Sequence, residues 1–149
     1  AGNLPFSTLA DAGLSRIERA LPPEKLRDLR RFLDGLYVGQ LSPEVDISDL
    51  GAMDPALLPA FEIAFLERRR LRFQYRDSKA VLTNRSVEPQ AMLILPPLWY
   101  LVAWDPARRD FRYFRMDRIS GPDLAHGATF QRRHVRFEDH VRPVRDLSR

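Results

Sequence analysis

Apolar residues recur at helical spacing in the first part of the chain. They lie three or four positions apart in "STLADAGLSRIERAL" (residues 7–21), and "PPEKLRDLRRFLDG" (residues 22–35) places its leucines and the following Leu36 on one face. These patterns predict a short pair of amphipathic helices, separated by two prolines that stop the first helix. Residues 37–53 mix Gly, Pro, Ser and Asp, which predicts a connector with one short strand.

A third helix is predicted over "DPALLPAFEIAFLERRR" (residues 54–70). Asp54 is suited to cap its N-terminus and Pro55 to its first turn, because proline fixes a helical φ where no N–H is needed. Pro59 removes a backbone hydrogen bond inside the segment and argues for a later start. The residues that share its apolar stripe are Leu57, Phe61, Ala64 and Phe65.

From residue 71 the pattern changes to alternating apolar and polar residues, which is the period of a half-buried strand. It predicts strands in "LRFQYR" (71–76), in 81–95 with Pro89 at an edge or bulge, in "LWYLVAW" (98–104) and in "FRYFRMDRIS" (111–120). The turns "DSKA" and "DPARRD" join them, and "GP" ends the last strand. Such an antiparallel meander closes most easily as a small barrel. We therefore expect an α+β fold in which amphipathic linker helices precede a small antiparallel β-barrel.

The length of 149 residues suits one domain with appended elements. We assign residues 1–52 to a helical linker region, residues 53–125 to the barrel and residues 126–149 to a basic C-terminal tail. Because the chain begins at Ala1 and its first helices lack a partner domain, we expect a fragment of a longer protein. The sequence contains no secretory signal, no cysteine, and no apolar run near the roughly 20 residues of a membrane span, so we expect a cytoplasmic protein.

Charge is distributed unevenly along the chain. Residues 1–67 carry 6 basic and 11 acidic side chains, a net charge of −5, whereas residues 68–149 carry 18 basic and 9 acidic side chains, a net charge of +9. Clustered positive charge favours an anionic partner, because it neutralises phosphates and speeds the encounter. Arginine makes up 22 of the 24 basic residues, and its planar guanidinium binds phosphate bidentately and stacks on aromatic rings. The alternative is a solvated charged surface.

The loop "DPARRD" fixes a register for the hairpin that contains both tryptophans. It predicts the pairs Trp104–Phe111, Ala103–Arg112, Val102–Tyr113, Leu101–Phe114, Tyr100–Arg115, Trp99–Met116 and Leu98–Asp117. One face of this hairpin is apolar and suited to the barrel core, with Trp99, Leu101, Phe114 and Met116. The other face interleaves aromatic rings with a guanidinium, the chemistry of base stacking or phosphate binding, with Tyr100, Trp104, Tyr113 and Arg115.

This second face also has a purely structural interpretation. Its aromatic rings suit a second hydrophobic layer packed against the N-terminal helices. The arginines at positions 112, 115 and 118 cannot all be buried without a partner, because an uncompensated buried charge costs several kcal/mol. They require water, an anionic ligand or carboxylates, for which Asp110 and Asp117 are the local candidates.

Several motifs together resemble the WYL domain, named after the Trp-Tyr-Leu at positions 99–101. A strand ends in "YR" at positions 75–76, "EP" follows at positions 88–89, and "LWYLVAW" precedes "FRYFRMDRIS". The resemblance covers roughly residues 55–125. The preceding helices are similar to the linker that joins this domain to an N-terminal winged helix-turn-helix in bacterial transcription regulators. No helix-turn-helix is visible in the sequence, which agrees with a C-terminal fragment.

The resemblance implies a barrel similar to the Sm and SH3 folds that acts as the effector-sensing part of a regulator. Family members are thought to bind single-stranded DNA or nucleotide-like ligands in a basic groove and to change operator binding in response. The implied partners are an anionic nucleic acid or nucleotide, DNA through the missing helix-turn-helix, and a second copy in a homodimer, with no cofactor, metal or membrane. The implied ligand-binding residues are Arg112, Arg115 and Arg118, with Tyr75, Arg76, Gln90 and Tyr100 beside them.

Two other functions are compatible with the sequence. One is a dimerisation or interaction module without a ligand, whose arginines pair internally, and the other is an Sm-like RNA-binding protein. An enzyme is not expected, because the sequence has no Gly-rich phosphate loop, no G-x-S-x-G and no H-E-x-x-H. His134, Glu138 and His140 form only a loose set of potential metal ligands and suit a solvated tail.

Overall fold

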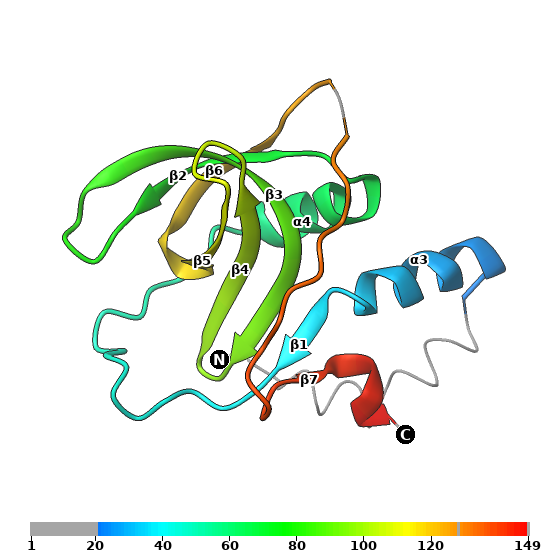
Figure 1. Ribbon diagram of the computed structural model, residues 1–149, viewed down its shortest axis with the longest axis horizontal. Helices are drawn as coiled ribbons and strands as arrows, with labels where there is room; N and C mark the ends of the chain where they lie inside the picture. The colour runs from blue at the N-terminus through cyan, green and yellow to red at the C-terminus, as the bar shows by residue number, and fades with distance from the viewer. Residues whose placement is uncertain (1–20, 128, 149) are drawn as a thin grey trace.

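The computed structural model describes residues 21–127 and 129–148 (Figure 1). These residues form an α+β fold, as expected, with two α-helices, seven strands and two 3₁₀ turns. The helices are α3 (Pro23–Leu33) and α4 (Leu57–Glu67), and the 3₁₀ turns are η1 (Met116–Arg118) and η2 (Val144–Ser148). The strands are β1 (Leu36–Val38), β2 (Leu71–Arg76), β3 (Leu82–Leu95), β4 (Leu98–Asp105), β5 (Asp110–Arg115), β6 (Ile119–Leu124) and β7 (Arg142–Pro143).

The long strand β3 organises the sheet, because it pairs with three other strands. Its first half is antiparallel to β2, and its second half is antiparallel to β4 and parallel to β1. β5 pairs with β4, and β6 returns to pair with β2. The bulge predicted at Pro89 is confirmed, since the register between β3 and β4 shifts between Pro89 and Ala91.

Two predictions about the sheet are wrong. The sheet is mixed rather than antiparallel, because the three residues of β1 pair in parallel with β3 and are too few to show a period in the sequence. The single strand predicted over residues 111–120 is interrupted by η1, and its second part, β6, runs through Gly121 and Pro122 to Leu124. The closed Sm-like or SH3-like barrel is not confirmed, since the hydrogen-bonded order β5-β4-β3-β1-β7 leaves β2 and β6 as a branch on β3.

The second and third predicted helices are confirmed, the third with a shifted start. Residues 7–20, most of the first predicted helix, lie outside the described residues. α3 begins at Pro23, and α4 begins at Leu57 rather than at residue 54. Asp54 is not the N-cap of α4, because its Oδ1 instead accepts the N–H of Ala56 at 2.9 Å in a turn that precedes the helix.

The main core lies between α4 and the sheet. Phe61 and Phe65 of α4 are fully buried and stack on each other with ring centroids 5.7 Å apart. Gly35, after α3, approaches the Phe65 ring so closely that a Cβ there would lie 2.4 Å from it. All four residues of the predicted apolar stripe of α4 are buried in this core, together with residues of β2, β3, β4 and β5.

A second apolar layer covers the opposite face of β3 and β4. Ala91, Leu93 and Val102 are buried there. The layer is closed by Tyr37 of β1 and by the C-terminal segment, which crosses the sheet before it reaches β7 (Figure 1), through Val135, Phe137 and Val141. We predicted that the N-terminal helices cover this layer, but most of its cover comes from the C-terminal segment. The weak sequence pattern of that segment does not predict a packed element.

Candidate functional site

The β4–β5 hairpin has the register that its loop predicts. All pairs from Trp104 opposite Phe111 to Tyr100 opposite Arg115 are confirmed. The pairs predicted for Leu98 and Trp99 are wrong, because the chain turns into η1 at Met116 and leaves the ladder. The core face is as expected, with Leu101, Phe114 and Met116 buried and Trp99 half-buried against the main core.

The three arginines of "FRYFRMDRIS" do not converge on one site. Arg112 pairs with Ala103 and shares the face of Phe114, whereas Arg115 pairs with Tyr100 on the opposite face. A spacing of three residues reverses the direction of the side chain in a strand, which explains the separation. The structure therefore divides these arginines between two clusters of charge.

The first cluster, called here the ion-pair cluster, consists of Arg115, Asp117, Arg118 and Asp49. Arg115 donates to both oxygens of Asp117, from Nε at 3.1 Å and from Nη2 at 2.7 Å. Asp49, in the loop after β1, accepts from Arg115 at 3.1 Å and from Arg118 at 2.8 Å. Asp117 is one of the two predicted carboxylate partners, whereas Asp110 accepts only the N–H of Phe111. Asp49 lies in the linker region and was missed.

Hydrogen bonding dominates the electrostatics of this cluster. The hydrogen bonds from Arg118 and Arg115 lower the pKa of Asp49 from its ordinary value of 3.8 to about 2. Burial opposes ionisation of Asp117, yet the hydrogen bonds from Arg115 and from the N–H of Gly51 lower its pKa overall. The hydrogen bond with Asp117 raises the pKa of Arg115, although burial acts in the opposite direction. Asp49, Asp117 and Arg115 therefore carry their charges at neutral pH.

Two predicted tyrosines lie beside this cluster. The Tyr75 hydroxyl accepts the N–H of Arg115 at 3.1 Å, while its ring packs edge-on against Phe114. Tyr100 is half-buried next to Arg115 in the ladder and forms an edge-on pair with Tyr113 at 6.4 Å. Burial raises the pKa of the Tyr100 hydroxyl, which keeps it a neutral hydrogen-bond donor at physiological pH.

An aromatic groove of about 730 Å³ opens along the same face of the sheet. Tyr100 and Tyr113 line it from β4 and β5, and Phe137 lines it from the C-terminal segment. Its remaining wall is the loop that follows β1, with Gln40, Leu41, Ser42, Pro43 and Val45. The groove thus combines exposed aromatic rings with a border formed by the loop that carries Asp49.

The second group of charges, called here the arginine cluster, consists of Arg85, Arg108 and Arg112. Arg85 and Arg108 lie 3.9 Å and 4.0 Å from the single buried carboxylate of Asp105. The Nε of Arg112 is buried and has no hydrogen-bond partner among the described residues. Burial, and then repulsion by Arg108, lower the pKa of Arg85. Two guanidinium groups thus share one carboxylate, and the charge of Arg112 acts on Arg85 as well, which leaves an excess of positive charge.

The remaining predicted site residues lie elsewhere. Arg76 is exposed at the end of β2, opposite Leu82. Gln90 is buried under the C-terminal segment, and its Oε1 accepts the N–H of Arg133 at 2.8 Å. The Arg133 guanidinium stacks 3.9 Å from the centre of the Trp104 ring, so that tryptophan also belongs to the contact with the C-terminal segment.

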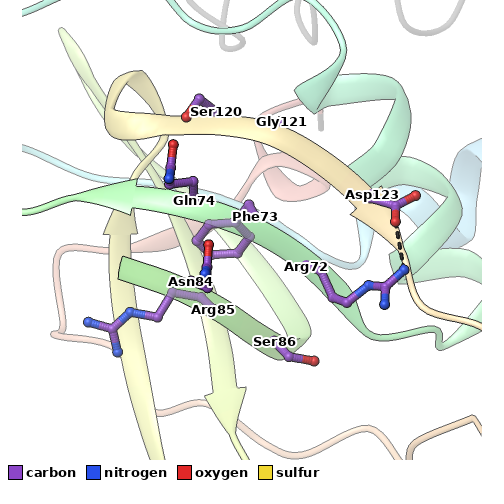
Figure 2. A pocket seen from close by; sticks show the side chains of 9 residues that line it. All are labelled: Arg72, Phe73, Gln74, Asn84, Arg85, Ser86, Ser120, Gly121 and Asp123. Atoms are coloured by element: carbon purple, nitrogen blue, oxygen red, sulfur yellow. Dashed lines mark hydrogen bonds and ion pairs between the residues drawn. The ribbon is translucent and has the colours of Figure 1, made fainter. Parts of the chain in front are cut away.

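A second hollow, of about 580 Å³, lies over β2, β3 and β6 and is lined mainly by residues with polar or charged side chains (Figure 2). An ion pair between Arg72 and Asp123, 2.6 Å long, closes one end of it. Figure 2 shows Arg85 at the other end, with its guanidinium directed away from that pair. Arg85 belongs both to the lining of this hollow and to the arginine cluster. None of the site residues predicted from the sequence lines the hollow.

Neither a metal site nor a membrane span is found in the described part of the chain. His140 hydrogen-bonds Glu138 at 3.1 Å, and its Nδ1 accepts the N–H of Gln40 at 3.2 Å. Among residues 21–127 and 129–148, no group of three or more His, Asp or Glu side chains could hold a metal ion. None of the helices in these ranges has the length and hydropathy needed to cross a bilayer.

One family model and one solved structure are similar to part of this chain. Residues 56–124, from just before α4 to the end of β6, match the family model of the WYL domain. Among solved structures, the chain is similar to the proteasome accessory factor B/C (PafBC) of Arthrobacter aurescens, with 26% sequence identity over 53% of this chain and a TM-score of 0.47. The chain spans 13% of the length of that protein.

Proposed function

Because residues 56–124 match the family model of the WYL domain, we propose that this chain is the ligand-sensing part of a bacterial DNA-binding transcription regulator. The ligand is anionic and is a single-stranded nucleic acid or a nucleotide. It binds at the arginine and aromatic side chains carried by β3, β4 and β5. DNA binding belongs to a helix-turn-helix outside this chain, and the regulator acts as a homodimer in the cytoplasm.

The excess charge of the arginine cluster is the observation that carries this proposal. Arg108 is about half exposed and Arg112 is partly exposed, so both can reach a ligand. A phosphate group would supply the charge that Asp105 alone cannot, and it would provide an acceptor for the buried Nε of Arg112. The guanidinium carbon of Arg85 lies 5.6 Å from the centre of the Phe114 ring, so this member of the cluster packs against a core side chain.

Replacing Arg108 and Arg112 together by glutamine tests the proposal. We expect the affinity for a fluorescently labelled single-stranded oligothymidylate, measured by anisotropy at low salt, to fall roughly tenfold or more, because each charge-assisted hydrogen bond contributes about 1.5–3 kcal/mol. Competition by thymidine monophosphate distinguishes a nucleotide ligand from a nucleic-acid strand. An unchanged thermal unfolding curve shows that the double variant is folded.

The matched control is the double variant Arg27→Gln/Arg142→Gln. It removes the same net charge from exposed arginines on α3 and β7. Because salt screens distant charges, we expect a change of about twofold or less. Equal losses in the two double variants, or a wild-type chain that does not bind the oligonucleotide, would contradict the proposed site.

A second candidate function is a dimerisation or interaction module without a ligand. The ion-pair cluster favours it, since Arg115 and Arg118 are neutralised by Asp117 and Asp49 within the chain. This function predicts a dimer without ligand in analytical ultracentrifugation and no oligonucleotide binding at any salt concentration. An Sm-like RNA-binding protein would instead sediment as a ring-sized oligomer.

A further inference from the structure

The loop between β1 and α4, residues 39–56, is unusual in length and charge. It contains no regular secondary structure, although loops longer than about 12–15 residues are uncommon in compact domains and are usually functional. Its four charged side chains are all acidic, namely Glu44, Asp46, Asp49 and Asp54. We call it the acidic loop, and its Asp49 lies against Arg115 and Arg118.

A few polar contacts hold the middle of the acidic loop in place. Asp49 bridges Arg115 and Arg118, as described above. The N–H of Gly51 donates to Asp117 at 3.1 Å, and Asp54 accepts the N–H of Gly121 at 3.2 Å. The loop therefore closes over η1 and the start of β6 mainly through charge.

Charge balance singles out Asp49 as the replaceable member of the ion-pair cluster. Asp117 is held by two hydrogen bonds from Arg115 and is buried, with 7% of its side chain exposed. Asp49 is 44% exposed and is the only described carboxylate paired with Arg118, a residue that is itself 13% exposed. Without Asp49, the cluster would keep one uncompensated positive charge at Arg118, whose Nε already lacks a partner among the described residues.

Three apolar side chains of the acidic loop stay outside both core clusters. Val45, Ile47 and Leu50 are exposed by 37%, 40% and 42%, so none of them anchors the loop in the core. The same loop also forms one wall of the aromatic groove with Tyr100 and Tyr113. Its movement would uncover guanidinium groups and aromatic rings at the same time.

We propose that the acidic loop is a gate in which Asp49 occupies the place of the ligand's phosphate: a phosphate-bearing ligand binds Arg115 and Arg118 by displacing Asp49. A phosphodiester carries one negative charge and two terminal oxygens, so it can replace the carboxylate without changing the charge of the cluster. Displacement frees the loop, which continues directly into β1 and α3 and so carries the signal towards the linker. This inference rests on the proposed function: the ion-pair cluster lies on the other face of the edge strand β5 from the arginine cluster, and a nucleic-acid strand bound at the arginine cluster would reach it with a further phosphate.

Replacing Asp49 by asparagine tests the gate, and Asp46→Asn is the matched control. Both variants remove one negative charge from the same loop, but the Asp46 carboxylate accepts the N–H of Ser48 and is not paired with an arginine in the described structure. We expect Asp49→Asn to bind the oligothymidylate at least about fivefold more tightly than Asp46→Asn does, the lower end of typical coupling between competing states. Hydrogen exchange of the Gly51 N–H should accelerate in Asp49→Asn, and in the wild-type chain when the oligonucleotide is added.

The outcomes separate the gate from the proposed function. If the wild-type chain binds the oligonucleotide and the two variants bind it equally well, the gate is wrong and the sensor function stands. If the wild-type chain binds while the exchange of Gly51 stays unchanged, the ligand does not displace the loop and the gate is also wrong. If neither the wild-type chain nor Asp49→Asn binds, the proposed function fails together with the gate.

Discussion

At the residue scale, the environment of each arginine decides its role more than its spacing does. Arg115 and Arg118 are balanced by carboxylates, whereas Arg112 adds its charge to that of Arg85 and Arg108, which share the single carboxylate of Asp105. The sequence could place Asp117 beside Arg115, because only two positions separate them. It could not place Asp49 there, because 66 positions separate Asp49 from Arg115 and only the tertiary fold brings them together.

The titration of Asp49 tests the ion-pair cluster directly. We expect its carboxyl group to titrate near pH 2 in the wild-type chain, as followed by the ¹³C chemical shift of the carboxyl carbon. Its pKa is lower in the folded chain than the ordinary 3.8, so it stabilises the closed loop fully above about pH 4. This contribution is lost as the pH falls through about 2.

Arg118→Gln provides the comparison for that titration, because the hydrogen bond from Arg118 is the largest cause of the low pKa. In this variant the midpoint should move back towards 3.8. A wild-type midpoint already at 3.8 would mean that Asp49 is not held by the arginines in solution.

At the scale of elements, the sequence predicts best where a regular period meets a short turn. The loop "DPARRD" set the register of β4 and β5 correctly, because the number of loop residues leaves few ways to pair the flanking strands. The sequence does not predict β1 as a parallel strand, because three residues are too few to show an alternation of apolar and polar positions. The irregular spacing of apolar residues in the C-terminal segment predicts a tail, yet Phe130 and Val144 are buried.

The junction between α3 and β1 depends on Gly35. A Cβ at this position would lie 2.4 Å from the Phe65 ring, which cannot easily retreat because it also packs against Phe61 and Phe32. We expect Gly35→Ala to lower the free energy of unfolding by about 1–3 kcal/mol, the usual cost of overpacking, measured by urea denaturation. Gly51→Ala is the control, since a Cβ at Gly51 meets nothing within 4 Å and should leave the stability nearly unchanged. Equal effects of the two substitutions would show that α3 does not pack on α4 as described.

At the scale of the whole molecule, the uneven charge of the sequence becomes a contact in space. The acidic first part supplies Asp49, and the basic second part supplies Arg115 and Arg118. The charge difference alone predicts an anionic partner for the basic part of the chain. The acidic first part of the same chain supplies some of that negative charge. The positive charge of Arg85, Arg108 and Arg112 exceeds the negative charge of Asp105. In the proposed function, this excess positive charge binds the ligand.

The salt dependence of oligonucleotide binding by the wild-type chain tests the central claim, that this chain senses an anionic ligand through its arginines. Each phosphate contact with a single strand contributes about 0.7 to the slope of the logarithm of the binding constant against the logarithm of the salt concentration. We expect a slope of about −1.4 or steeper, which corresponds to two or more phosphate contacts. A slope near zero, or no binding at low salt, would contradict the claim.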